Sequence, residues 1–248
     1  MNDLGFKVQG SDISNNKNIE RLRKEKIKVF IGHKKQNIEK GTILVVSSAI
    51  KKNNPELLAA KKKQLPIYKR GEMLANIVSL TKNIVVVGSH GKTTTTSLIA
   101  SIFQETKIAP TIINGGVINS INNYAKLGKS DWSILEADES DGTFIKLPAT
   151  IAVVTNIDPE HLDFYGSFDE VRKAYVSFVA NIPFYGLAVL CIDHPEVQSL
   201  IPKISDRKIV KYGFNAQADI RAENLTTNAG RSEFDIIFQS GTIPPFIG

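Results

Sequence analysis

The sequence of 248 residues predicts an α/β fold with a mainly parallel sheet and crossover helices. Two observations lead to this prediction. Short runs rich in β-branched residues alternate with helical stretches along most of the chain, as in folds whose helices connect parallel strands. In addition, residues 83–106 read as a strand that passes through a glycine-bearing turn directly into a helix. Such units are typical of nucleotide-binding α/β domains.

The elements expected early in the chain are strand 42–49, helix 54–64, strand 66–70 and helix 71–80. Asn54 and Pro55 are suitable residues to begin the first of these helices. The elements expected later are strands at 83–89, 131–138, 150–157 and 187–193, and helices at 92–106 and 167–182. Ser167 and Glu170 form a capping box at the start of the last helix. After about residue 205 we expect only short strand-like pieces.

The charge distribution suggests a boundary near residue 80. The chain carries a formal net charge of +6, yet residues 1–80 hold 17 Lys and Arg against 7 Asp and Glu. No aromatic residues interleave these lysines, so solvated faces are favoured over a nucleic-acid-binding surface. The sequence therefore predicts one domain over 1–80 and a second over 81–248, with no nucleic-acid partner.

Composition is that of a soluble globular protein, with 42% hydrophobic and 23% charged residues. No apolar run approaches the roughly 18–20 residues that span a bilayer, and the first residues do not resemble a signal segment. A single cysteine, Cys191, excludes an intrachain disulfide. These features predict a cytoplasmic protein without membrane insertion. They favour no particular oligomeric state.

The stretch VVVGSHGKTTTTSLIA, residues 85–100, contains a Gly-Lys-Thr typical of nucleotide phosphate sites. The general P-loop pattern requires a glycine five positions before Gly91, where this chain has Val86. The context nevertheless predicts a phosphate site, because a strand precedes the turn and a helix follows it. The first N–H groups of that helix have no intrahelical partners, and the helix dipole is positive there.

Two glycines of this loop, Gly88 and Gly91, allow the backbone to approach the phosphates. Lys92 supplies a positive charge to the β and γ oxygens, and Thr93 offers a hydroxyl to Mg²⁺. The alternative, a tight strand–helix turn with an incidental lysine, is less favoured because the context is right on both sides.

Acidic residues follow two of the later strands. The first group is Glu136, Asp138, Glu139 and Asp141, and the second is Asp158, Glu160, His161 and Asp163. In parallel sheets ligands bind beyond the carboxyl ends of strands, and clustered carboxylates repel one another unless a cation is bound. Oxygen ligands with few imidazoles favour Mg²⁺ or Mn²⁺ over zinc. Among the four histidines, His161 has the strongest support.

Several stretches together resemble the Mur ligases. In the second part these are GSHGKTTTTSLIA, INGG, EADESDGTFI, AVVTNIDPEHLD and NIPFYGLAVLCID. In the first part GFKVQGSD, IGH and VVSSAI with the following NPE resemble the family's UDP-binding domain. The resemblance extends over nearly the whole chain in one order. It implies a partial Rossmann-like UDP-binding domain over 1–80, followed by a P-loop-type ATPase domain over 81–248.

The resemblance implies an ATP-dependent ligase that joins L-alanine to UDP-N-acetylmuramate in peptidoglycan precursor synthesis. The expected ATP-binding residues are Gly88, Ser89, His90, Gly91, Lys92, Thr93 and Thr94. One Mg²⁺ is expected on Thr93 and Glu136, and a second on Glu136 and His161. Lys92, Glu136 and His161 are the residues expected to act in catalysis.

The substrate-binding residues are likewise implied by the resemblance. Those expected to contact the UDP group are Ser11, Asp12, His33, Ser47 and Ser48, and those expected in a loop facing the muramate are Asn114, Gly115 and Gly116, with Ser140. The family's glycine-rich turn for the UDP diphosphate should precede the chain, and its adenine-contacting segment and C-terminal amino-acid-binding domain should follow Gly248. We therefore expect a shortened chain.

In the implied mechanism the muramate carboxylate attacks the γ-phosphate of ATP, and the alanine amine then displaces phosphate. This chemistry requires charge neutralisation rather than a nucleophilic side chain. A ligase of the same family that reattaches recycled peptides, another P-loop enzyme such as a small kinase or a folate-type ligase, and a non-catalytic nucleotide-binding remnant are the alternatives. The stretches EADESD and VVSSAI count against an unrelated P-loop enzyme.

Overall fold

The computed structural model describes residues 1–118, 123–204 and 206–239. The chain forms two compact units, Met1–Ile77 and Val78–Gly248. Within the described ranges, no helix is both long enough and apolar enough to cross a membrane.

The first unit contains two parallel strand pairs, each connected through a helix. In the first pair, β1 (Gln9–Asp12) and β2 (Lys28–Ile31) flank α1 (Lys17–Lys24). In the second pair, β3 (Leu44–Val46) and β4 (Ile67–Lys69) flank α2 (Pro55–Lys62). The unit also contains η1 (Asn2–Leu4), η2 (Lys35–Ile38) and most of α3 (Arg70–Val78).

Helix α2 begins where the sequence predicts. The Asn54 side chain accepts hydrogen bonds from the backbone N–H groups of Glu56 and Leu57, at 2.9 and 3.2 Å. Pro55 occupies the first helical position, where its missing N–H group has no consequence. This start directs Glu56 into the interior of the unit, where 7% of the residue is exposed.

The described part of the second unit is built on a nine-stranded sheet, in the order β13-β12-β11-β10-β9-β5-β8-β6-β7. The strands are β5 (Lys82–Val87), β6 (Thr111–Ile118), β7 (Asn123–Lys126), β8 (Trp132–Glu136), β9 (Ile151–Val154), β10 (Leu187–Cys191), β11 (Ile209–Gly213), β12 (Ile220–Asn228) and β13 (Arg231–Phe238). Among the described strands of this sheet, β7 and β13 at the two edges are the ones antiparallel to their neighbours. The predicted α/β fold with a mainly parallel sheet is confirmed.

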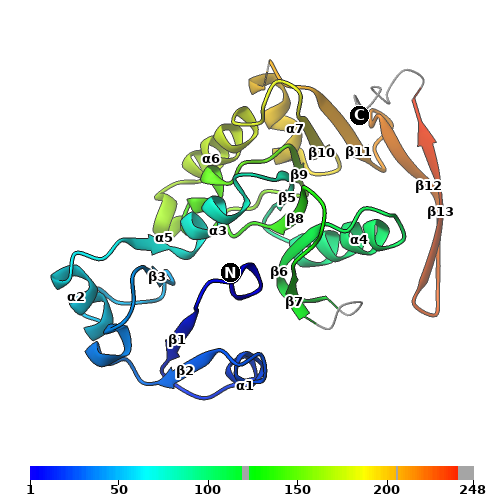
Figure 1. Ribbon diagram of the computed structural model, residues 1–248. Coiled ribbons are helices and arrows are strands. Elements are labelled where there is room, and N and C mark those ends of the chain that lie inside the picture. The colour runs from blue at the N-terminus through cyan, green and yellow to red at the C-terminus, as the bar shows by residue number, and fades with distance from the viewer. Residues whose placement is uncertain (119–122, 205, 240–248) are drawn as a thin grey trace. The chain divides into compact units, whose positions relative to one another are not determined.

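Helices flank this sheet (Figure 1). They are α4 (Lys92–Gln104), α5 (Leu162–Tyr165), α6 (Phe168–Ala180) and α7 (Pro195–Leu200), with the short η3 (Thr143–Lys146) and η4 (Ile201–Lys203). The predicted cap of α6 is confirmed, because Ser167 Oγ accepts a hydrogen bond of 3.3 Å from the Glu170 N–H. Helix α7 is not predicted by the sequence, since its six residues are too few to show a helical period.

The central strand β5 is covered on both faces. Ile84 and Val86 pack in one buried cluster with Ala100 of α4. Successive side chains of a strand point to opposite faces, so Val85 and Val87 serve the other face, and both are fully buried. Another part of the core is aromatic: the Phe144 ring lies 5.3 Å from that of Tyr175 and 5.4 Å from that of Phe178 on α6.

The order of the strands determines where a ligand can bind. Strand β5 pairs in parallel with β8 on one side and with β9 on the other. The carboxyl ends of all three strands therefore meet at one edge of the sheet. Because the chain leaves β5 toward one side and later returns to the other, this edge is a topological switch point, where open α/β sheets bind their ligands.

An ion pair connects α6 to α7 and carries a prediction about acid stability. Arg172 donates to both carboxylate oxygens of Glu196, at 2.7 and 2.9 Å. This hydrogen bonding lowers the pKa of Glu196 below its usual 4.5, so the pair stabilises the fold above that pH and the stabilisation is lost as pH falls through the lowered pKa.

We expect Glu196→Gln to lower the melting temperature near neutral pH by about 1–3 °C, because both partners are partly exposed. Thermal unfolding near neutral pH and well below pH 4.5 checks this, and the difference from the parent should vanish in acid. Asp131→Asn, which breaks the exposed pair with Lys82, is the control and should have little effect at either pH. A difference that persisted in acid would contradict the assignment.

Candidate active site

The loop between β5 and α4 has the geometry of an anion site. Gly91 precedes α4 in the left-handed conformation, with φ 77°, and no side chain caps the helix. The N–H groups of the first turn, at Lys92, Thr93 and the exposed Thr94, are therefore directed toward the end of the helix without a capping partner. Backbone donors and the positive end of the helix dipole favour a phosphate here.

The segment after β9 determines the shape of this loop. The His90 N–H donates to Asn156 Oδ1 at 2.7 Å, and both Thr155 Oγ1 and Asn156 Nδ2 donate to the His90 carbonyl at 2.9 Å. Ser89 Oγ accepts from the Asp158 N–H at 2.8 Å. The loop is thus fixed from the neighbouring strand before any ligand binds.

Gly88 is required where the loop contacts that segment. Its φ is +145°, and a Cβ atom would overlap Thr155 Oγ1 and lie 3.1 Å from the backbone N and O of Asn156. We expect Gly88→Ala to displace the loop and to weaken nucleotide binding by at least about tenfold, as calorimetric titration with ADP would measure.

Gly166→Ala is the matched control, because Gly166 also has a positive φ, +78°, but no atom within 4 Å of the added methyl group. It should cost only the backbone strain, about 1–2 kcal/mol, and leave nucleotide binding unchanged. Equal ADP affinities for the parent and Gly88→Ala would contradict the assigned role of Gly88.

The Lys92 side chain lies across its own loop. Its ammonium donates to the carbonyl oxygens of Gly88 and Ser89, at 2.5 and 3.2 Å, and to Glu139 Oε1 at 2.8 Å. The pair is well shielded from solvent, since 15% of the Lys92 side chain and 7% of the Glu139 side chain are exposed. The phosphate loop is therefore connected directly to the acidic segment after β8.

Glu139 is the most buried carboxylate of this site. Burial raises its pKa above the usual 4.5, against the opposing effect of the hydrogen bond and charge of Lys92. Its second oxygen, Oε2, is buried and has no hydrogen-bond partner among the described residues. The Tyr165 hydroxyl donates to the Glu139 carbonyl at 2.6 Å and fixes the backbone. A buried oxygen without a partner is suited to bind a cation.

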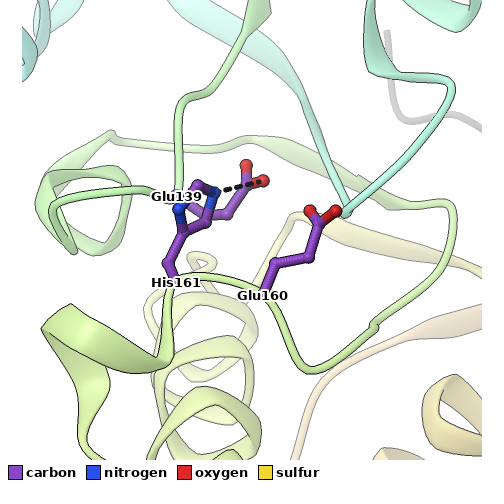
Figure 2. A group of neighbouring side chains, drawn as sticks. All are labelled: Glu139, Glu160 and His161. Carbon is purple, nitrogen blue, oxygen red and sulfur yellow. Dashed lines mark ion pairs between the residues drawn. The ribbon is translucent and has the colours of Figure 1, made fainter.

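Glu139, Glu160 and His161 form a cluster whose potential ligand atoms all lie within 4.8 Å of one another (Figure 2). His161 Nε2 lies 3.7 Å from Glu139 Oε1. His161 has a positive φ of 55°, at the start of α5. Two carboxylates and one imidazole fit a divalent cation, and oxygen ligands favour Mg²⁺ or Mn²⁺.

Another carboxylate, that of Glu136, lies beside Thr93 in the first turn of α4. Both oxygens of Glu136, the last residue of β8, lie 3.0 Å from Thr93 Oγ1, and Oε2 accepts from the Gly115 N–H at 2.6 Å. The structure thus brings Thr93 and Glu136 together, as the sequence analysis expects. The cluster around His161 contains Glu139 rather than Glu136, so a shared ligand role of Glu136 and His161 stays a prediction.

Asn114, Gly115 and Gly116 lie in strand β6 rather than in a loop, because β6 continues beyond its pairing with β8. A Cβ atom on Gly115 would lie 2.8 Å from Glu136 Oε2, and one on Gly116 would lie 2.7 Å from Thr93 Cγ2. The two glycines therefore allow β6 to approach the residues expected to bind metal. The Asn114 amide donates to Ser97 Oγ at 3.1 Å, and its Oδ1 atom is buried without a partner among the described residues.

The remaining candidate residues lie after β8 or in the first unit. Ser140, after β8, donates its N–H to Asp138 Oδ1 at 3.0 Å. In the first unit, Ser11 Oγ donates to Glu56 Oε2 at 2.7 Å and lies 3.0 Å from His33 Nδ1. Asp12, Ser47 and Ser48 lie where β1 and β3 end, and both serines are exposed.

Several residues of these sites have no role predicted from the sequence. Glu56 connects Ser11 with Asn37, whose amide donates to it at 2.6 Å. Asp158 lies 3.4 Å from His90 Nε2 and 3.5 Å from His194 Nε2. The sequence places His194 just beyond the end of a predicted strand. That position alone does not indicate Asp158 as its partner.

Both units match known protein families. The Mur ligase middle domain matches residues 86–246, and the catalytic domain of the Mur ligase family matches residues 1–82. The chain belongs to the Mur ligase family. The phosphate loop and the carboxylates after β8 and β9 all lie within the first of these matches.

Among curated proteins, the chain is similar to members of the family named for one reaction. Over 240 residues, 97% of this chain, it is 54% identical to the UDP-N-acetylmuramate–L-alanine ligase of Brucella ovis, and 53% identical to that of Rhizorhabdus wittichii. The chain covers 51% of each of these relatives, so it spans about half the length of the curated relatives it matches.

Solved structures of Mur ligases share the fold. A UDP-N-acetylmuramate:L-alanyl-γ-D-glutamyl-meso-diaminopimelate ligase of Neisseria meningitides matches with a TM-score of 0.85 and 23% identity, over 95% of this chain and 78% of that one. The UDP-N-acetylmuramate–alanine ligase MurC of Thermotoga maritima matches with a TM-score of 0.84 and 23% identity, over 98% of this chain and 54% of that one.

Proposed function

We propose that the chain carries the nucleotide- and UDP-sugar-binding parts of an ATP-dependent ligase that joins L-alanine to UDP-N-acetylmuramate. The observation that carries the proposal is the 54% identity, over 97% of the chain, to ligases of that name. The site agrees with it, because a phosphate loop, a lysine and several carboxylates meet at one edge of the sheet.

The reaction takes two steps. A carboxylate oxygen of the muramate attacks the γ-phosphorus of ATP. The bond between this phosphorus and the bridging oxygen breaks, ADP departs, and the muramate becomes an acyl phosphate. The alanine amine then attacks the acyl carbon, inorganic phosphate departs with the bonding electron pair, and the nitrogen loses a proton. Both steps concentrate negative charge on phosphate oxygens. Lys92 and the N–H groups that begin α4 are placed to neutralise that charge.

The carboxylates suit bound Mg²⁺. Glu136 and the Thr93 hydroxyl would hold one ion near the phosphate loop, and His161 with Glu139 and Glu160 offers a second set of ligands. The buried oxygen of Glu139 without a partner supports this second set. When bound, Mg²⁺ supplies charge neutralisation to the phosphates beyond that of Lys92.

Substrate recognition divides between the two domains, which we place at 1–80 and 81–248. The UDP group is assigned to the first domain, at Ser11, Asp12, His33, Ser47 and Ser48. The muramate is assigned to the second, at Asn114, Gly115, Gly116 and Ser140. The side chain of Ser11 is held by Glu56 and so has a fixed orientation, which is suited to recognition of a polar ligand. We place the reaction in the cytoplasm, where its nucleotide substrate is present.

The test is a ligation assay followed by mass spectrometry. Because the chain matches about half the length of its relatives, both the chain and a chimera with the unmatched parts of the Brucella ovis ligase are assayed. Each is incubated with ATP, Mg²⁺, UDP-N-acetylmuramate and L-alanine. UDP-muramoyl-alanine from the chimera supports the proposal. ADP binding without product would indicate a non-catalytic nucleotide-binding chain.

A further inference from the structure

The ammonium group of Lys92 has no free donor for a phosphate. An ammonium has three N–H donors, and those of Lys92 have three acceptors: the carbonyls of Gly88 and Ser89 and the carboxylate of Glu139. A phosphate that binds in the loop must therefore replace at least one of them. Of the three acceptors, only Glu139 carries a negative charge, so it competes most strongly with the phosphate.

The position of Glu139 makes it a suitable competitor. It is 5% exposed, and Tyr165 fixes its backbone through a hydrogen bond of 2.6 Å. The carboxylate therefore does not follow Lys92 into the loop. His161 Nε2 also lies close to this carboxylate, 3.7 Å from Glu139 Oε1. A buried carboxylate that loses its lysine is destabilised unless another positive or donating group replaces it.

We infer that Glu139 is a positioning residue for Lys92, which it holds at the phosphate loop in the nucleotide-free chain and releases to the incoming phosphates. This inference rests on the proposed nucleotide-binding function. Glu139 sets the starting position of the lysine, and the cost of separating the two side chains lowers the affinity of the empty loop for nucleotide. When Lys92 has moved to the phosphates, the carboxylate is free to interact with His161 and with a cation at the cluster in Figure 2.

The test compares the ADP affinity of the 248-residue chain, Glu139→Gln and Glu160→Gln by calorimetric titration, with a chelator present to exclude metal. Glutamine keeps the size of the side chain but removes the competing charge. We expect Glu139→Gln to bind ADP about tenfold more tightly. A change of that size corresponds to the loss of one competing hydrogen bond between charged groups. Because the chelator excludes metal, any ligand role of Glu160 is not in use, and Glu160→Gln removes only a more exposed charge of the same cluster. We expect it to change the ADP affinity by less than about threefold.

A double-mutant cycle with Lys92→Ala separates competition for the lysine from general electrostatic repulsion. Without Lys92, the effect of Glu139→Gln should fall to that of Glu160→Gln. A merely structural role of Glu139 predicts weaker ADP binding in the variant. Equal effects of the two glutamine substitutions in the parent background, or weaker binding by Glu139→Gln, would overturn the inference.

A second measurement does not depend on nucleotide. Brief treatment with acetic anhydride and mass spectrometry of the peptides give the acylation rate of Lys92, with the exposed Lys82 as an internal reference. We expect Lys92 to react several-fold faster in Glu139→Gln than in the parent, and at the parental rate in Glu160→Gln. Glu139→Asp keeps the charge on a shorter side chain, and it replaces Glu139→Gln if the glutamine variant does not fold. We expect it to change the ADP affinity and the Lys92 acylation rate in the same direction as Glu139→Gln. An unchanged Lys92 rate in both Glu139 variants would overturn the inference.

The outcomes separate this inference from the proposed function. If the parent chain bound no ADP, the nucleotide site itself would be contradicted. If the parent bound ADP normally and Glu139→Gln did not differ from Glu160→Gln, only the role of Glu139 would be lost.

Discussion

Lys92→Ala is expected to abolish ATP-dependent ligation, with a loss of at least about 10³-fold in turnover. The lysine charge acts on the oxygens of the transferred phosphoryl group, where negative charge develops, and alanine supplies no replacement. The ammonium already lies on the loop, bound to the Gly88 and Ser89 carbonyls. Phosphate release by the chimera with the unmatched parts of the Brucella ovis ligase is the measurement.

Lys82→Ala is the matched control for this variant. Lys82 begins β5, at the opposite end of the strand from the loop, and its ammonium forms an exposed pair with Asp131 at 3.5 Å. Its removal takes away one positive charge and should leave turnover unchanged. Because Lys92→Ala leaves Glu139 buried without its partner, turnover is expressed per folded molecule. Activity of Lys92→Ala within a few-fold of the parent would remove Lys92 from the mechanism.

Local patterns predicted most of the fold of the second unit. The strand, turn and helix predicted over residues 83–106 are present over 82–104, because apolar runs, glycines and caps act over a few neighbouring residues. The capping residues Asn54 and Ser167 were recognised for the same reason. Strands β6 and β7 were not predicted, because β6 contains two glycines and its antiparallel pairing with β7 depends on tertiary contacts.

The sequence predicts which segments form the candidate site, but not which of their side chains contact one another. The phosphate loop and the two acidic segments could be recognised because each follows an apolar run. Which carboxylate meets Lys92 depends on the order of β9, β5 and β8 in the sheet, which no local pattern contains. Glu139 is 47 residues from Lys92 in the sequence, yet their side chains lie 2.8 Å apart. The pairing of His194 with Asp158 likewise depends on β10 lying next to β9.

Glu136→Gln is expected to leave the fold intact and to lower metal-dependent turnover by about 10²–10³-fold, a loss typical of removing one charge-stabilising group from an active site. Glutamine keeps an oxygen that can accept hydrogen bonds from the Thr93 hydroxyl and the Gly115 N–H, which Glu136 binds at 3.0 and 2.6 Å. The substitution replaces the other oxygen with an NH₂ group and removes the negative charge that Mg²⁺ requires.

The measurements are phosphate release as a function of Mg²⁺ concentration and the melting temperature of the same preparation. Glu105→Gln is a suitable control, because Glu105 directly follows α4 at the opposite end from the phosphate loop and is exposed. Both measurements should therefore match the parent. A metal role for Glu136 predicts a normal melting temperature with low turnover that high Mg²⁺ restores only in part. If Glu136→Gln melted much earlier and kept normal turnover per folded molecule, Glu136 would be a structural carboxylate that holds Gly115 and Thr93 together. The role of Glu136 would then be to hold β6 close to Thr93.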